Sequence, residues 1–142
     1  MGRLARGFAC GVAAAAVWAA AEPMLRRVTR TDYSDVRLIG DALPGDSQLP
    51  GVALHCLNGG MFGAAFSALG LSGVRQGVLV AELEGAGLWP LTILVDRYHP
   101  TVRSGEWAPV SRDPRAFGHS ALGHLVFGAT LGALTSRSAA TR

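Results

Sequence analysis

The chain has 142 residues, of which 49% are hydrophobic and 16% are charged, and its mean hydropathy is +0.29. Soluble domains usually carry about 25% charged residues, so this composition argues against a water-soluble globule. The 13 basic residues are all arginines that alternate with Asp and Glu in loops and helix flanks, so no basic stripe for nucleic acid is predicted.

Four apolar stretches of 19 to 21 residues organise the chain, and they cover residues 7–25, 51–71, 77–95 and 116–135. Crossing ~30 Å of hydrocarbon takes about 20 residues of helix. In lipid each backbone segment must satisfy its own hydrogen bonds, so these stretches are predicted to be helices. We therefore predict an all-α polytopic membrane protein with four transmembrane helices, in the plasma membrane of a bacterium.

The connections between these stretches are long, short and long. Residues 72–76 predict a tight turn that makes the second and third spans antiparallel neighbours. Loops 26–50 and 96–115 hold eight of the 13 arginines, which favours a cytoplasmic side for both loops. In the first loop, residues 33–40 predict a short helix that Ser34 or Asp32 caps and Gly40 ends.

The pattern His-x-x-x-Gly-x-x-x-Gly-Ala occurs at residues 55–64 and again at 124–133, 69 residues apart. It predicts one membrane domain, 1–142, built from two helical hairpins, 1–71 and 72–142. Two spans per hairpin give both copies the same orientation, so the repeat is a parallel one. Glycines four residues apart share a helix face and let another backbone approach closely. The predicted helix-packing residues are Gly59, Gly63, Gly128 and Gly132.

Residues 123–128, Gly-His-Leu-Val-Phe-Gly, resemble the last span of small bacterial multi-span proteins of the YagU-like kind, and residues 55–63 resemble it more loosely. This resemblance implies an inner-membrane protein and no particular activity.

The first stretch also has features of a secretory signal, because Arg3 and Arg6 precede an apolar core and 19–21 are three alanines. Cleavage would leave three spans. We favour its retention, because it supplies the partner of the third stretch in the repeat.

Ionisable groups inside a span cost several kcal/mol unless they are paired or hydrated. The intramembrane polar candidates are His55, Asn58, Glu82, Glu84, His119 and His124. His55 and His124 are expected at equivalent depths, as interhelical hydrogen-bonding groups, as a proton relay, or as haem or metal ligands that His119 or Glu82 would join. Glu82 and Glu84 lie about 200° apart around a helix, so only one of them is expected to face the bundle interior.

Other polar and aromatic residues are expected at the membrane surface. Glu22 precedes Pro23 near a span end and is expected at the interface, and Asp32 and Asp35 are expected to be solvated turn formers. Trp89–Pro90 predicts a kink. The expected interface anchors are Trp18, Tyr33, Trp89, Tyr98 and Trp107.

The sequence contains no phosphate loop, dinucleotide fingerprint or HExxH motif, and residues 118–122 lack the second glycine of a nucleophile elbow. No catalytic residue, metal or cofactor is predicted. The favoured function is a non-enzymatic membrane component that packs with itself or with a membrane partner through its glycine faces. Two alternatives stay open: a small transporter or proton-coupled subunit that uses His55, His124 and Glu82 or Glu84, and a haem- or metal-binding membrane redox subunit.

Overall fold

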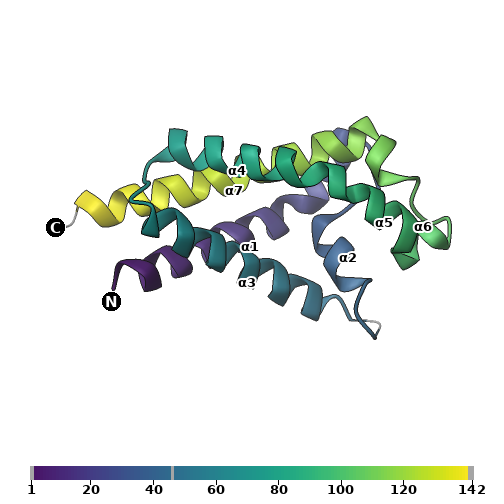
Figure 1. Cartoon of the computed structure of the whole chain (residues 1–142), viewed down its shortest axis with the longest axis horizontal. Helices are drawn as coiled ribbons and strands as arrows, with labels where there is room; N and C mark the ends of the chain where they lie inside the picture. Colours follow the sequence, from purple (N-terminus) through teal and green to yellow (C-terminus); the bar gives the residue numbers. More distant parts are fainter. Residues whose placement is uncertain (1, 46, 141–142) are drawn as a thin grey trace.

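The computed structural model describes residues 2–45 and 47–140, and the regular elements in these ranges are all helical (Figure 1). The predicted all-α class is therefore confirmed. The long helices are α1 (Arg3–Thr29), α3 (Leu49–Ala68), α4 (Val74–Leu88) and α7 (Pro114–Ala140). Shorter elements gather at one end of the bundle: α2 (Asp35–Gly40), η1 (Trp89–Leu91), α5 (Thr92–Tyr98), α6 (Pro100–Arg103) and η2 (Val110–Arg112).

The long helices pack in the order α3, α1, α7, α4. The most extensive contacts join α1 to α3, α4 to α7 and α1 to α7, whereas α3 and α4 make few contacts with one another. The prediction that the second and third spans pack as neighbours is therefore wrong, although the turn between them makes them antiparallel. They are consecutive in the chain, but α3 packs on α1 and α4 packs on α7, because both glycine faces turn toward these two helices.

The turn between α3 and α4 spans residues 69–73, a few residues earlier than predicted. Gly70 and Gly73 have φ angles of +72° and +92°, which L side chains rarely adopt. Gln76 is already helical, and its side-chain oxygen accepts a 2.8 Å hydrogen bond from the Ser72 amide. Arg75 and Gln76 thus belong to α4 because Gly73 ends the turn before them.

Glycine contacts hold α1 to α3. A Cβ atom at Gly11 would overlap the Gly59 carbonyl, and one at Gly63 would overlap the Gly7 carbonyl. Similar contacts hold α4 to α7, where a Cβ at Gly77 would overlap the Gly128 carbonyl and one at Gly132 would overlap the backbone of Gly73. The predicted packing glycines thus contact helices of the same chain. The origin of the two halves as one duplicated hairpin stays a prediction.

The short helix predicted in the first loop is confirmed. It begins at Asp35 and ends at Gly40, and the Ser34 hydroxyl caps it by accepting a hydrogen bond from the Arg37 amide. The helix packs against α3, where Gly51 and Gly40 approach closely. The kink predicted at Trp89–Pro90 takes the form of the 3₁₀ turn η1 between α4 and α5.

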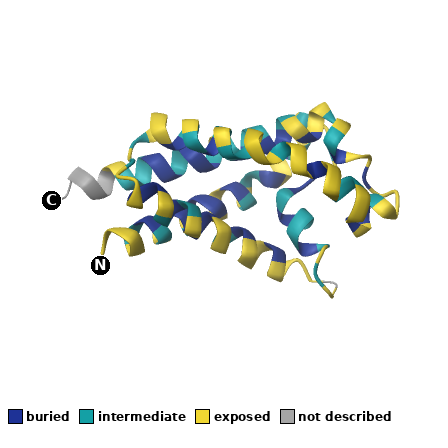
Figure 2. Cartoon of the chain, viewed as in Figure 1, coloured by how far each residue is buried: buried dark blue, intermediate teal, exposed yellow. Residues whose placement is uncertain are grey.

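Two segments are long and apolar enough to cross a membrane, Arg3–Thr29 and Val74–Tyr98. Only 11% of the most apolar window of the second segment is buried, so its apolar side chains face outward. Figure 2 shows exposed residues along the outer faces of the bundle. Large apolar side chains that are more than half exposed include Leu79, Leu83, Leu91, Ile93 and Leu94.

Three of the five aromatic residues expected at the membrane surface are buried instead. Trp18, Tyr33 and Trp107 are each at most 6% exposed, whereas Tyr98 is 62% exposed. Trp18 is buried because Gly123 of α7 has no side chain, and a Cβ there would overlap the indole. Tyr33 and Trp107 pack on one another beside α2, with ring centroids 5.4 Å apart.

Candidate functional site

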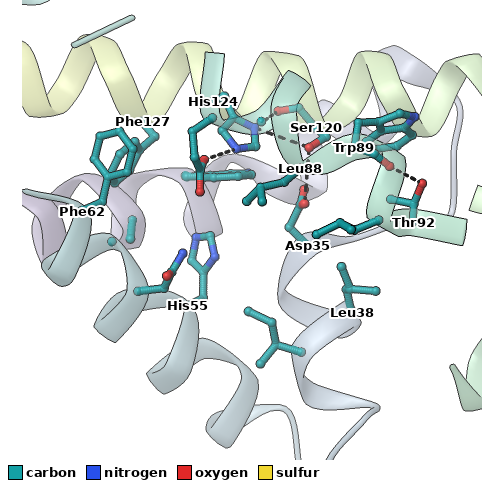
Figure 3. A pocket seen from close by; sticks show the side chains of 18 of the residues that line it. Asp35, Leu38, His55, Phe62, Leu88, Trp89, Thr92, Ser120, His124 and Phe127 are labelled. Atoms are coloured by element: carbon teal, nitrogen blue, oxygen red, sulfur yellow. Dashed lines mark hydrogen bonds and ion pairs between the residues drawn. The ribbon is translucent and has the colours of Figure 1, made fainter. Parts of the chain in front are cut away.

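A cavity of about 290 Å³ lies where α3 and α4 face each other with few contacts (Figure 3). Side chains of α1, α2, α3, α4, α5 and α7 line it, so residues far apart in the sequence meet there. Five aromatic side chains form much of its wall: Trp18, Tyr33, Phe62, Trp89 and Phe127. Its polar groups are Asp35, His55, Asn58, Glu84, Thr92, Ser120 and His124.

His124 and Glu84 form an ion pair at this cavity. The Nε2 atom of His124 lies 3.1 Å from a Glu84 carboxylate oxygen, and its Nδ1 atom lies 2.8 Å from the Ser120 carbonyl. Both ring nitrogens face acceptors, an arrangement that the doubly protonated imidazolium satisfies with two donors. Gly85 makes room for this ring, because a Cβ there would lie 2.8 Å from it.

His55 lines the same cavity from α3, and its ring is 6% exposed. Its Nε2 atom is buried without a hydrogen-bond partner in the described part of the chain. A neutral imidazole carries one N–H donor and one lone-pair acceptor. His55 therefore lines the cavity with its ring, while its Nε2 atom is covered by surrounding protein atoms.

Trp18 contacts both of the histidines that were expected at equivalent depths. Its ring centroid lies 4.7 Å from that of His55 and 4.8 Å from that of His124. The two imidazoles thus share a cavity and an aromatic neighbour. This arrangement does not favour joint ligation of haem, since both nitrogens of His124 already have partners.

Asp35 reaches the cavity from the first turn of α2. Its Oδ1 atom accepts a 2.8 Å hydrogen bond from the Tyr33 hydroxyl and lies 3.5 Å from Ser120 Oγ. Burial raises the pKa of Asp35 to about 6, although the Tyr33 hydrogen bond acts in the opposite direction. The prediction of a solvated turn former is wrong, because the packing of α2 on α3 turns this carboxylate inward.

Of the three remaining polar candidates, only Asn58 lines this cavity. Glu82 lines a small recess between α4 and α7 with Phe117 and Ala121, on a different side of α4 from Glu84. Asn58 lines the cavity and is exposed. His119 is fully buried beside Glu22 and Asp35.

Glu22 is 7% exposed, so its expected position at the membrane interface is wrong. The Ser34 hydroxyl and the Val36 amide donate to its two carboxylate oxygens. The sequence contained one signal for this role, since Glu22 is the only charged residue within 7–25. An acid placed alone in an apolar segment needs a partner, and the partner proves to be the start of α2.

Comparisons of the chain with protein-family models, with curated proteins and with solved structures gave no match. The resemblance to YagU-like proteins stays a prediction.

Proposed function

We propose that this chain is a four-span membrane protein that binds a small amphipathic amine in the cavity between α3 and α4. The observation that carries the proposal is the presence of two carboxylates, Glu84 and Asp35, in one aromatic-walled cavity whose described lining contains no arginine. An ammonium group supplies a positive charge and hydrogen-bond donors for these carboxylates.

The proposal of four spans rests on helix length and on the outward apolar side chains. At 1.5 Å per residue the 20 residues of α3 extend about 30 Å, and the 27 residues of α7 extend about 40 Å, enough to cross the hydrocarbon core. Histidine, asparagine and glycine lower the hydropathy of these two helices. The histidines of both helices, together with Asn58, line the cavity or lie in the bundle interior, so lipid would meet mainly the apolar remainder.

The chemistry of the cavity selects the class of ligand. Its described lining contains two carboxylates, two imidazoles and no arginine, and His124 is already bonded to Glu84. Aromatic faces attract cations as well as apolar groups. An ammonium head beside Glu84 and an apolar body against Trp89 and Phe62 therefore fit the lining. The gap between α3 and α4 offers entry from the bilayer.

The favoured interpretation from sequence, association through glycine faces, has less support. Gly59, Gly63, Gly128 and Gly132 contact α1 and α4 of the same chain, so a partner would have to use other surfaces. The cavity supports the transporter alternative instead. Uptake of the bound amine into sealed vesicles would identify the chain as a transporter.

Isothermal titration of protein in phosphatidylcholine nanodiscs tests the proposal, with empty nanodiscs as reference. The probes are benzylammonium and its uncharged isostere ethylbenzene. We expect saturable binding of benzylammonium and at least tenfold weaker binding of ethylbenzene, a difference of about 1.4 kcal/mol. Equal affinities, or no saturable binding of benzylammonium, would contradict the proposal.

Two variants of the same helix sharpen the test. Glu84→Gln removes the carboxylate that lines the cavity, and we expect it to weaken benzylammonium binding about tenfold or more. Glu82→Gln removes a carboxylate two residues away that does not line the cavity, and we expect wild-type affinity. Identical affinities of the two variants would exclude Glu84 as the site of the ammonium group.

A further inference from the structure

Behind the cavity, three potential ligand atoms from three helices converge. They are the carboxylate of Glu22 in α1, the carboxylate of Asp35 in α2 and the imidazole of His119 in α7, and one ligand atom of each lies within 4.8 Å of the others. His119 Nε2 is 3.9 Å from Glu22 Oε1 and 3.8 Å from Asp35 Oδ2. These separations are too long for hydrogen bonds.

His119 is the unusual member of this group. It is 0% exposed, and neither of its ring nitrogens has a hydrogen-bond partner in the described structure. The Oδ2 atom of Asp35 is likewise buried without a partner. Buried polar atoms without partners cost about 1–3 kcal/mol each. Of these three atoms, His119 Nε2 and Asp35 Oδ2 lie only 3.8 Å apart, so one bound group could satisfy both.

The other atoms of the two carboxylates are held in place. Ser34 Oγ donates to Glu22 Oε2 at 2.6 Å, the Val36 amide donates to Glu22 Oε1 at 3.1 Å, and the Tyr33 hydroxyl donates to Asp35 Oδ1. Hydrogen bonds of this kind orient carboxylate ligands in metal sites. Asp35 Oδ2 and Glu22 Oε1 are the carboxylate oxygens that lie within 4 Å of His119 Nε2.

We propose that Glu22, Asp35 and His119 bind a divalent first-row transition ion. Ligand bonds of about 2.0–2.2 Å hold neighbouring donor atoms about 3–3.4 Å apart. The observed 3.8–3.9 Å separations need contraction by about half an ångström. One imidazole and two carboxylates suit Zn²⁺, Mn²⁺ or Fe²⁺ better than Ca²⁺ or Mg²⁺, which prefer oxygen ligands only.

The ion would tie α2 and the loop before it to α1 and α7. It goes beyond the proposed amine site, because Glu22 and His119 do not line that cavity. Asp35 belongs to both sites, but Glu84 tests benzylammonium binding whereas Glu22 and His119 test metal binding, so either proposal can fail without the other.

The experiment uses the whole chain in detergent, freed of any polyhistidine tag and stripped with a chelator. Titration with Co²⁺, followed by its visible d–d absorption, is expected to reach a plateau at one equivalent per chain. Zn²⁺ is expected to displace Co²⁺ and to raise the thermal unfolding midpoint. Absence of a plateau, or a midpoint unchanged by Zn²⁺, would overturn the proposal.

The variants His119→Ala and Glu22→Gln are each expected to weaken Co²⁺ binding at least about 100-fold. His99→Ala is the matched control, since it removes a buried imidazole outside both the cluster and the cavity, and is expected to bind Co²⁺ as the wild type does. Circular dichroism establishes that each variant is folded. Folded His119→Ala protein with wild-type Co²⁺ affinity would also overturn the proposal.

Discussion

The Ser34 hydroxyl donates a 2.6 Å hydrogen bond to Glu22, which joins the cap of α2 to the buried face of α1 in its C-terminal half. The same Oγ atom accepts from the Arg37 amide. One side chain thus starts a helix and satisfies a buried carboxylate.

Replacing Ser34 with Ala removes both functions, and we expect the free energy of unfolding to fall by about 2 kcal/mol. Ser47→Ala is the control, because Ser47 makes its hydrogen bond at the exposed start of α3. Chemical denaturation in detergent measures both variants. Equal losses for the two variants would contradict the role given to Ser34.

Substitution at the packing glycines tests the helix order. Gly11→Ala and Gly77→Ala each place a Cβ against backbone atoms of the neighbouring helix, which cannot move aside as a side chain can. We expect each to destabilise the protein by about 1–3 kcal/mol. Gly87→Ala is the matched control, because a Cβ there meets no atom within 4 Å, and its better helix propensity is expected to leave stability unchanged or slightly higher. Similar unfolding midpoints for all three would contradict the packing.

Much of the backbone follows from composition and spacing. The apolar stretches, the Ser34 cap and the Trp89–Pro90 break are local signals, and the corresponding helices, cap and 3₁₀ turn are present. The site is different, because Glu22, Asp35 and His119 come from separate helices. Their meeting depends on the packing of α1 against α7, which no local pattern encodes.

The short connection between α3 and α4 is the reason why they were wrongly predicted to pack against each other. A five-residue turn keeps the ends of α3 and α4 together but leaves their axes free to diverge. Glycine faces then decide the partners, and those of α3 and α7 select α1 and α4. The burial of Trp18 could not be predicted from local sequence either, because it depends on Gly123, which is 105 residues away in the sequence.

The ionised carboxylate of Asp41 stabilises the fold, and this contribution depends on pH. Burial acts to raise the pKa of Asp41, but hydrogen bonds from Gln48 and Thr101 and the charge of Arg37 outweigh burial and lower it. A carboxylate with a lowered pKa stabilises the fold above the unfolded pKa, and this contribution is lost as the pH falls through the folded pKa.

We therefore expect the thermal midpoint to fall as the pH drops below about 4. Asp41→Asn is expected to lower the midpoint at pH 7 and to flatten this decline, whereas Asp32→Asn, at an exposed position, keeps the wild-type slope. Thermal unfolding midpoints of the wild type and both variants, measured from pH 3 to 7, test this prediction. Parallel curves for Asp41→Asn and wild type would show that another acid is responsible.

Asp96 fastens the loop before α7. Its carboxylate accepts hydrogen bonds from the amides of Val110 and Ser111 and from the Ser111 hydroxyl. Asp96→Ala removes all of these, so we expect amide hydrogen exchange at residues 107–112 to accelerate about tenfold or more, which corresponds to about 1.4 kcal/mol. Arg103→Ala, an exposed change nearby, is the control, and equal exchange in the two variants would contradict this role.

The start of α1, the turn between α3 and α4 and the end of α7 all lie at one end of the molecule (Figure 1). Close glycine contacts hold α1 to α3 and α4 to α7, and the packing of α1 on α7 joins the two hairpins. A gene interrupted at this connection would therefore encode two pieces that reassemble by themselves. The same feature makes the connection a natural place for a fused reporter or for new chain ends.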